Sequence, residues 1–323
     1  MEELLRDCLR TPLKHHVTDI HFSLRDAEVR TEMRVRGEMR QLRKQYDPAF
    51  FRYLMYRADL DVTNVLEPQT GRFETEVDGR VLALRFAVVS SFHITSGVLR
   101  ILNNHGVISL SALSAEPSQE AWFSDITRHR SGLYVFSGPT GSGKTTTLYA
   151  ILDHAAHKKI YTLEDPVEIY SEKYVQLQIN EKQNLGYADG IKQLMRHDPD
   201  IIMIGEIRDG TAARMAVRSA LTGHLVVTSL HSFSCLGAIR RLVELGVPAY
   251  QLQDVLEGVS CQRLYDTADG GRIGVYEIMD RAEVRHYFEH GTTTAAFIPL
   301  AARLEEAVAA GLVSADQAAA DLD

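Results

Sequence analysis

The sequence has few cysteines, and none of them are paired. Its 323 residues include three, Cys8, Cys235 and Cys261, which lie far apart with no CxxC pair. A zinc ribbon and a dithiol redox motif both need paired cysteines, so neither is supported. Isolated buried thiols are the more ordinary interpretation, and no zinc is expected.

Long apolar runs and an excess of basic residues are also absent. No window approaches the roughly 20 apolar residues that cross a bilayer, and the acidic N-terminus lacks the apolar core of a signal peptide. The net charge is −8, which makes nucleic acid and anionic lipid poor default partners. We therefore expect a cytoplasmic protein that does not bind nucleic acid directly and that meets the inner face of the membrane through a partner.

A glycine-rich stretch, GPTGSGKT at 138–145, is the strongest motif. It fits G-x-x-x-x-G-K-[ST], the P-loop of nucleotide-binding proteins, and lies between an apolar strand pattern at 133–136 and a helical pattern at 146–156. These flanks argue against an accidental glycine-rich turn. We expect Lys144 to meet the phosphates of ATP and Thr145 to ligate Mg²⁺. The expected nucleotide-binding residues are Gly138, Pro139, Thr140, Gly141, Ser142, Gly143, Lys144, Thr145 and Thr146.

The pattern of elements predicts two different halves. Residues 1–103 show helix-flanked antiparallel hairpins and predict a small α+β domain. Residues 104–130 predict a linker with connecting helices. Residues 131–290 alternate strands and helices, which predicts an α/β domain with a parallel sheet covered on both faces. Residues 291–323 predict a helical tail, for which packing helices are favoured over a partner-binding helix.

Acidic residues follow one predicted buried strand, in TLEDPVE at 162–168. In open α/β sheets, ligands bind beyond the carboxyl ends of the strands. A buried carboxylate there needs a partner, so we favour a role for Glu164 beside Mg²⁺ or a water bound to it. Asp165 is also consistent with a turn, and Glu168 with a solvated face.

A second strand, in DPDIIMIGEIRD at 198–209, occupies the place of a Walker B element. The usual metal-binding aspartate is replaced by Gly205, and Glu206 follows it. We therefore predict that Glu206 orients or deprotonates the attacking water. A simple salt bridge with Arg208 is the weaker alternative.

Two histidines, His224 and His231, flank a third strand in TGHLVVTSLH at 222–231. Seven residues of strand would separate them by roughly 23 Å, which is too far for a metal pair. A single histidine usually has a structural hydrogen-bonding role. Here, however, the histidines flank a strand that is expected to neighbour the nucleotide-binding strand, which suggests that His231 senses the γ-phosphate.

Two arginines, Arg85 and Arg100, lie in otherwise apolar strands of the first domain. An arginine there needs an anionic partner, and a phosphate would serve. An exposed strand face is an equal alternative from the residues alone.

Taken together, these stretches resemble the secretion ATPase superfamily, the motors of type II secretion, type IV pili and competence pseudopili. Residues 18–22 resemble its SDIH element, 34–37 its hairpin, and 68–73 its PQDGR element. Residues 138–145, 162–168, 198–209 and 222–231 match its Walker A motif, Asp box, Walker B box and His box. The order of these elements covers nearly the whole chain.

The resemblance implies a PAS-like first domain, a RecA-like second domain and a homo-hexamer that uses ATP and Mg²⁺. It implies that Arg85 and Arg100 are arginine fingers, although the hairpin near them at 88–93 is shorter than in the family. It also implies a polytopic membrane platform protein as partner. The expected hinge lies at 103–110.

The sequence departs from the pattern of the secretion ATPase superfamily in two ways, and these narrow the choice of family branch. CQRL at 261–264 is separated from GGRIGVYEI at 270–278 only by 265–269, without the tetracysteine zinc insertion of many assembly ATPases. The long N-terminal docking domain is missing from the sequence too. The chain is thus similar to the short competence ATPase of Gram-positive bacteria. Residues 238–248 look more like the assembly branch than the AIRNLIRE-like element of retraction ATPases.

We therefore predict a hexameric ATPase that drives assembly of a competence pseudopilus for DNA uptake. The alternatives are a type IV pilus retraction ATPase or a type II secretion ATPase. A nucleic-acid motor and a non-hydrolysing scaffold are rivals from other classes.

Overall fold

The structure, a computed structural model, divides into two compact units, Met1–Gly106 and Val107–Asp323. It describes residues 1–14, 17, 19–25, 28–35, 38–42, 44, 46–64, 66–91, 93–102, 108–155, 157–179, 185–267 and 271–322. Most of the expected hinge (103–107), Gly37 of the first expected hairpin and Phe92 of the 88–93 hairpin lie outside these residues. The finer predicted boundaries at 103, 130 and 290 stay predictions.

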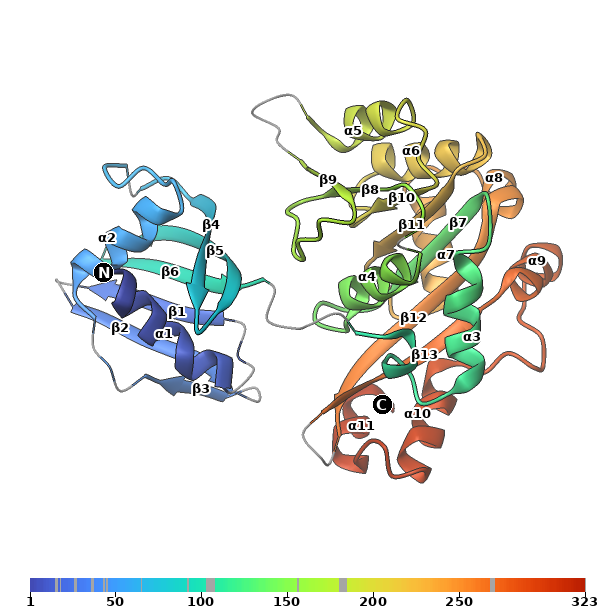
Figure 1. The fold of residues 1–323 in the computed structure, drawn as a ribbon. Coiled ribbons are helices and arrows are strands. Elements are labelled where there is room, and N and C mark those ends of the chain that lie inside the picture. The colour runs from blue at the N-terminus through green and yellow to red at the C-terminus, as the bar shows by residue number, and fades with distance from the viewer. Residues whose placement is uncertain are drawn as a thin grey trace. The chain divides into compact units, whose positions relative to one another are not determined.

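The first unit is an antiparallel sheet with helices on one face (Figure 1). The strand order is β3-β2-β1-β6-β5-β4. Its strands are β1 (Asp19–Arg25), β2 (Glu28–Val35), β3 (Glu38–Gln41), β4 (Gln69–Val77), β5 (Arg80–Ser91) and β6 (Ile94–Ile101), and its helices are α1 (Glu2–Lys14) and α2 (Pro48–Arg57). The inward residues of alternating strands, such as Phe22 and Phe86, pack against α1 and α2 in one core. The expected antiparallel hairpins with flanking helices are confirmed, and the PAS-like classification of this half stays a prediction.

Local sequence signals set the boundaries of these elements. Asp47 caps α2 by accepting a hydrogen bond from the Phe50 amide at 2.9 Å, and Pro48 occupies the first turn. The turn between β4 and β5 places Asp78 and Gly79 at φ +51° and +80°. Two successive positive φ angles are typical of the tightest hairpin turn, which explains the Asp-Gly pair.

The second unit is built on a seven-stranded sheet in the order β13-β12-β7-β11-β10-β8-β9. Its strands are β7 (Gly132–Ser137), β8 (Ile160–Glu164), β9 (Val175–Gln178), β10 (Ile201–Ile204), β11 (Leu225–Leu230), β12 (Leu256–Asp266) and β13 (Arg272–Met279). The expectation of a parallel sheet needs one correction, because β13 pairs with β12 in the antiparallel sense. The strands β9, β12 and β13 were not expected from the sequence.

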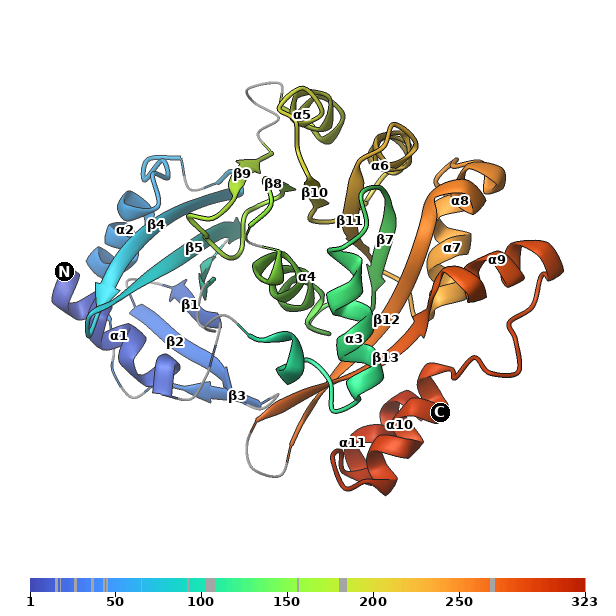
Figure 2. The ribbon, with the colours of Figure 1, turned by 45° about the vertical axis from the view of Figure 1, so that its right-hand side comes forward.

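Helices cover both faces of this sheet (Figure 2), as the alternation of strands and helices predicts. One face packs against α5 (Tyr187–Leu194), α6 (Gly210–Leu221), α7 (Cys235–Glu244), α8 (Ala249–Val255) and α9 (Arg281–His290). The other packs against a short 3-10 turn, η1 (Leu110–Ala112), and against α3 (Pro117–Ile126) and α4 (Lys144–His154). On β7, Leu133 and Val135 face the first layer, whereas Tyr134 and Phe136 face the second.

The C-terminal helices pack on the same unit. α10 (Leu300–Ala309) and α11 (Ala315–Leu322) share a small core with Tyr265 of β12 and Val275 of β13. Figures 1 and 2 both show them beside these two strands. Asp321 of α11 also accepts hydrogen bonds from Arg263 and Tyr265, at 3.1 and 2.7 Å. The packing interpretation of the tail is thus consistent with its contacts.

A buried carboxylate on β13 joins two helix starts. Glu277 is 3% exposed. Its two oxygens accept from the backbone amides of Cys235 and Leu300, at 2.6 and 2.8 Å, which are the first residues of α7 and α10. Helix N-termini leave unpaired amides and carry a partial positive charge, so one carboxylate stabilises both.

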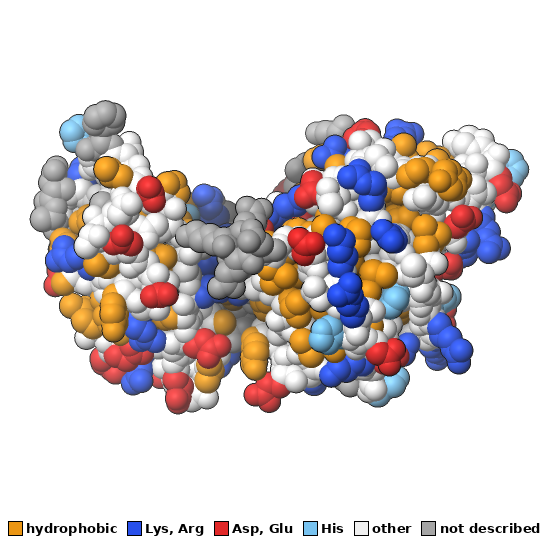
Figure 3. Space-filling view, turned by 90° about the horizontal axis from the view of Figure 1, so that it is seen from above, with side chains coloured by type: hydrophobic (Ala, Val, Ile, Leu, Met, Phe, Trp, Pro, Cys, Tyr) orange, Lys and Arg blue, Asp and Glu red, His pale blue; other side chains and the backbone are white. Residues whose placement is uncertain are grey.

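The surface carries both signs of charge. Figure 3 shows acidic and basic side chains on each unit of the face seen from above. Among the described residues, no helix combines the length and the apolar character needed to cross a membrane. All three cysteines are free and buried, as expected.

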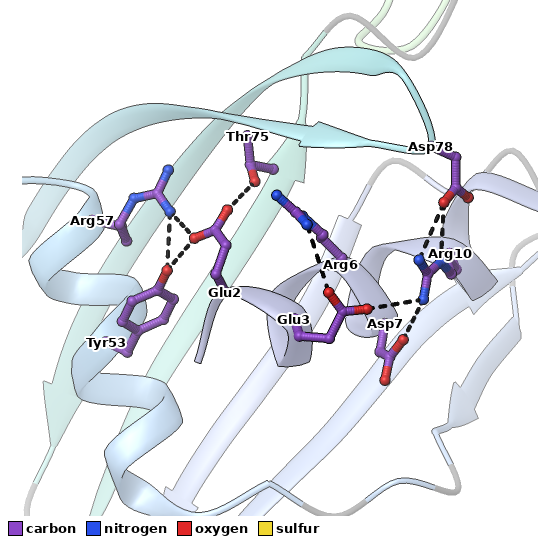
Figure 4. A network of polar contacts seen from close by, with 9 residues as sticks. All are labelled: Glu2, Glu3, Arg6, Asp7, Arg10, Tyr53, Arg57, Thr75 and Asp78. Carbon is purple, nitrogen blue, oxygen red and sulfur yellow. Dashed lines mark hydrogen bonds and ion pairs between the residues drawn. The ribbon is translucent and has the colours of Figure 1, made fainter.

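Polar contacts fasten α1 to the rest of the first unit (Figure 4). Glu2 accepts hydrogen bonds from Tyr53 and Arg57 of α2, and from Thr75 of β4 at 2.6 Å. At the other end, Arg10 bridges to Asp78 in the β4–β5 turn. These contacts hold α1 along the β4–β5 hairpin.

Candidate nucleotide-binding and hydrolysis site

The P-loop connects β7 directly to α4. Gly138, Gly141 and Gly143 have φ angles of +146°, +83° and +89°, in the region that favours glycine. A Cβ atom at Gly138 would lie 2.5 Å from both the Gln262 carbonyl oxygen and Ser142 Oγ. The first glycine is therefore required by backbone conformation and by space.

Lys144 opens α4 and is buried, with 8% of its surface exposed. Its Nζ donates to the carbonyl oxygens of Gly138 and Pro139, at 2.9 Å each. Burial lowers the pKa of this ammonium, and the charge of Glu206 partly opposes that effect. Within the described part of the chain, the hydrogen bonds of this buried cation go to loop carbonyls alone. The phosphates of a nucleotide would give it a charged partner.

Thr145 and Thr146 lie in the first turn of α4 and are partly exposed. A hydroxyl in the first turn after a P-loop lysine is suited to Mg²⁺, a cation that prefers oxygen ligands. The residues present therefore fit a nucleotide with its metal. The individual ligand roles stay predictions.

Glu206 follows β10, whose neighbours β8 and β11 run parallel to it. Its Oε2 forms a salt bridge with Arg208 Nε at 2.9 Å, and its Oε1 lies 2.9 Å from His231 Nε2. The salt bridge that we ranked as the weaker alternative is thus present, and the same carboxylate also faces the histidine. Its role toward water stays a prediction.

Arg208 ties two sequence elements together at this edge of the sheet. Besides Glu206, its Nη1 donates to Asp165 Oδ2 at 2.7 Å. Asp165, for which we left a simple turn open, therefore has a charged partner. The carboxyl ends of β8 and β10 are joined through this arginine.

His231 follows β11 and reaches the P-loop. Its Nδ1 lies 3.2 Å from the Gly138 carbonyl oxygen, while Nε2 faces Glu206. Both ring nitrogens face acceptors, so the two contacts are satisfied together only if the ring carries both protons or Glu206 carries one. His224 lies at the opposite end of β11 and contacts the nearby residues Ser219 and Thr222. Of the two histidines, His231 is therefore the one that reaches the P-loop.

Glu164 ends β8 and is 2% exposed. It accepts hydrogen bonds from Tyr149 of α4 at 2.8 Å and from Thr162 at 2.6 Å. Burial raises the pKa of this carboxyl, against the effect of these donors. A Cβ atom on Gly205 would lie 3.2 Å from Glu164 Cγ, so Glu164 fills the space beside the position where Walker B strands carry aspartate.

The two arginines of the first unit lie on neighbouring strands. Arg85 of β5 is directly opposite Arg100 of β6, and Arg72 of β4 is opposite Arg85. Arg100 Nε donates to Asp19 Oδ1 of β1 at 2.6 Å. The anionic partner expected for Arg100 is thus an aspartate within this unit, and the arginine-finger role stays a prediction.

Sequence reasoning missed several residues around this site. Tyr149 holds Glu164, and Gln262 of β12 donates to the Ser142 carbonyl of the P-loop at 2.7 Å. We used CQRL only as a landmark for the missing insertion. No local pattern indicates that β12 lies beside β7, so Gln262 had no signal of its own.

The P-loop between β7 and α4, with Glu206 and His231 at the ends of neighbouring strands, defines a P-loop ATPase. Such enzymes hold a nucleotide on loop amides and place a carboxylate near the terminal phosphate. The chain belongs to the family described as Type II/IV secretion system protein, whose model matches residues 1–305.

Known proteins of this family cover most of the chain. Competence protein ComGA of Bacillus subtilis (strain 168) is 34% identical over 274 residues, which are 83% of this chain and 77% of that protein. Type II secretion system protein E of Dickeya dadantii (strain 3937) is also 34% identical, over 90% of this chain and 59% of that protein. The chain spans little more than half the length of the type II relatives.

Solved structures show the same fold. The ATPase DotB of Yersinia pseudotuberculosis has a TM-score of 0.79 at 19% identity, covering 100% of this chain and 94% of that one. The pilus retraction motor PilT with bound ADP has a TM-score of 0.76 at 24% identity, covering 98% and 96%. At these identities the likeness shows the fold alone.

Proposed function

We propose that the chain is an ATPase motor that drives assembly of a competence pseudopilus for DNA uptake. It works as a homo-hexamer in the cytoplasm, on the inner face of the cell membrane, against a polytopic platform protein. The observation that carries the motor assignment is the connection of Glu206 to the P-loop through His231. A carboxylate linked to the loop that binds the terminal phosphate suits a nucleotide-dependent switch.

The residues have separate roles in this proposal. Lys144 and the loop amides would hold the phosphates, and Thr145 would hold Mg²⁺, with an indirect contribution from Glu164. The metal supplies neutralisation of phosphate charge. Glu206 orients the attacking water and accepts its proton, and His231 exchanges its contacts when the γ-phosphate is present.

Arg85 and Arg100 are proposed to stabilise the charge that develops on the phosphates, as arginine fingers do. The ion pair of Arg100 with Asp19 would then be exchanged for a phosphate.

The competence assignment is supported by the 34% identity to a competence protein over 83% of the chain. A type II secretion system protein E matches at the same identity over 90%, so a type II secretion ATPase is the second candidate. The segment between Leu264 and Gly270 is short and lacks the tetracysteine insertion that assembly ATPases of secretion and pilus systems usually carry. This difference favours the competence ATPase over the type II secretion ATPase.

The test is made in the source cell with a chromosomal Glu206→Gln replacement. Surface filaments, DNA uptake and protein secretion are scored together. Loss of filaments and uptake supports the assembly motor. Persisting filaments without uptake indicate retraction, and loss of secretion alone indicates type II secretion; either result overturns the competence assignment.

A further inference from the structure

We propose that Gln262 is a positioning residue of the P-loop, which holds the Ser142 carbonyl so that the next amide points toward the phosphates. The proposal rests on the proposed function only in requiring that this loop binds nucleotide. It does not depend on which machine the ATPase drives.

Gln262 lies on β12, which pairs in parallel with β7. In that register Cys261 is aligned with Ser137, the last residue of β7, so Gln262 falls beside the start of the P-loop. Its side chain is buried, with 1% of the residue exposed. Strand pairing therefore fixes this side chain under the loop.

The side-chain amide of Gln262 supports the loop backbone from below. Its Nε2 donates to the Ser142 carbonyl oxygen at 2.7 Å. A Cβ atom on Gly143 would lie 3.3 Å from the same Nε2. Because only the amide nitrogen can donate to a carbonyl, chemistry fixes which end of the Gln262 amide faces the loop.

Peptide geometry turns this contact into an effect on the phosphate site. The Ser142 carbonyl and the Gly143 N–H belong to one trans peptide, in which C=O and N–H point in opposite directions. When Gln262 holds the carbonyl inward, the Gly143 N–H points to the other side of the loop. Successive P-loop amides that point to one concave side of the loop form the nest that binds phosphate.

The side-chain amide of Gln262 leaves polar atoms nearby unpaired. Gln262 Oε1 and Ser142 Oγ are both buried without a hydrogen-bond partner among the described residues. An apolar side chain of similar length would remove the unpaired Oε1 but would leave the buried Ser142 carbonyl without its donor. What the amide contributes at this place is therefore its hydrogen bond to the loop. The retained donor is explained if it orients the loop.

Two variants separate orientation from packing. Gln262→Met keeps the length and removes the donor, and we expect ATP and ADP affinity to fall roughly three- to tenfold with the fold retained. In Gln262→Glu only the protonated acid can donate to Ser142, so affinity should be weak at pH 8 and recover toward wild type as pH falls. Each value is divided by the wild-type affinity at the same pH.

Ser260→Ala is the matched control. Ser260 lies on the same strand, is 0% exposed, and its Oγ has no hydrogen-bond partner among the described residues. It should bind nucleotide like wild type. Affinity is measured by titration with a fluorescent ADP analogue, and folding by thermal melting.

Wild-type affinity in a folded Gln262→Met, or a pH-independent loss in Gln262→Glu, overturns the proposal. If Gln262→Met melts below the assay temperature, the pH dependence of nucleotide affinity in Gln262→Glu alone tests the proposal. A wild-type protein that binds nucleotide but has no role in uptake or secretion would overturn the proposed function and leave Gln262 unaffected.

Discussion

The imidazole of His231 lies between Glu206 and the P-loop: Nε2 is 2.9 Å from Glu206 Oε1, and Nδ1 is 3.2 Å from the Gly138 carbonyl oxygen. Lys144 donates to the same carbonyl at 2.9 Å. A bound phosphate would draw the Lys144 ammonium away from the Gly138 carbonyl. That carbonyl would then lose one of its two donors, and its contact with His231 would change. This shared acceptor gives a direct path from nucleotide to Glu206.

Glu206→Gln should bind ATP normally and lose turnover. The amide keeps the size and one acceptor but cannot take a proton from water, which costs about 10²-fold or more in kcat. Phosphate release and ATP affinity are measured side by side. Glu244→Gln, an exposed member of an ion pair on α7, is the control. Wild-type turnover in Glu206→Gln would refute the role of this carboxylate.

His231→Ala should reduce discrimination between ATP and ADP. Without the ring, the contact from Gly138 to Glu206 is broken, so the ratio of ATP to ADP affinity should fall while ADP affinity changes little. His224→Ala, at the other end of β11, should keep the wild-type ratio, because its contacts are local. If His231→Ala keeps the same ratio of ATP to ADP affinity as His224→Ala, His231 is not a sensor of the γ-phosphate.

Glu164→Gln should flatten the pH dependence of stability. Burial raises the pKa of Glu164, so the folded state holds this proton more tightly than the unfolded chain does. The resulting stabilisation is complete below the unfolded value of about 4.3 and is lost as pH rises through the folded pKa. Melting temperature should therefore fall less between pH 5 and pH 8 in the variant than in wild type.

The Glu164 variant has a second readout. If the carboxylate acts beside Mg²⁺, its ATPase rate should need a higher Mg²⁺ concentration for half-maximal activity. An unchanged pH dependence of melting would contradict the raised pKa of this buried carboxyl. If the Mg²⁺ concentration for half-maximal activity is unchanged, Glu164 does not act beside the metal, and the prediction about its pKa is unaffected.

Arg85→Ala and Arg100→Ala should lower kcat by about 10²-fold or more, with little change in ATP affinity, if both act as arginine fingers. The Arg100 change also removes the partly exposed pair with Asp19, which contributes about 0–1 kcal/mol to stability. Arg80→Ala, at the start of the same strand as Arg85, is the control. Steady-state kinetics and thermal melting measure both effects, and normal kcat would exclude the role.

The sequence predicted those parts of the fold and site that depend on local pattern. The P-loop and the strands before Glu206 and His231 follow from short motifs whose chemistry is local. The strands β12 and β13 were missed because polar and charged residues interrupt them, so neither shows the continuous apolar run of the other buried strands. Their pairing with β7, and hence the place of Gln262, depends on packing between segments far apart in the sequence.

The partner of Arg100 was also beyond sequence reasoning. An arginine in an apolar strand signals a need for an anion, and both a phosphate and an exposed face were consistent with it. Only strand register shows that Asp19 lies directly opposite Arg100. Similarly, the Arg208 contact with Asp165 requires the adjacent ends of β8 and β10.

Glu277 has a consequence for local unfolding. Its carboxylate holds the first amides of α7 and α10, at 2.6 and 2.8 Å. Backbone amides exchange with solvent only when their hydrogen bonds open, and groups that open together form one cooperative unit. Because both bonds end on one buried side chain, the Leu300 amide should exchange in step with that of Cys235. The start of the C-terminal helices would then report on the segment that follows His231.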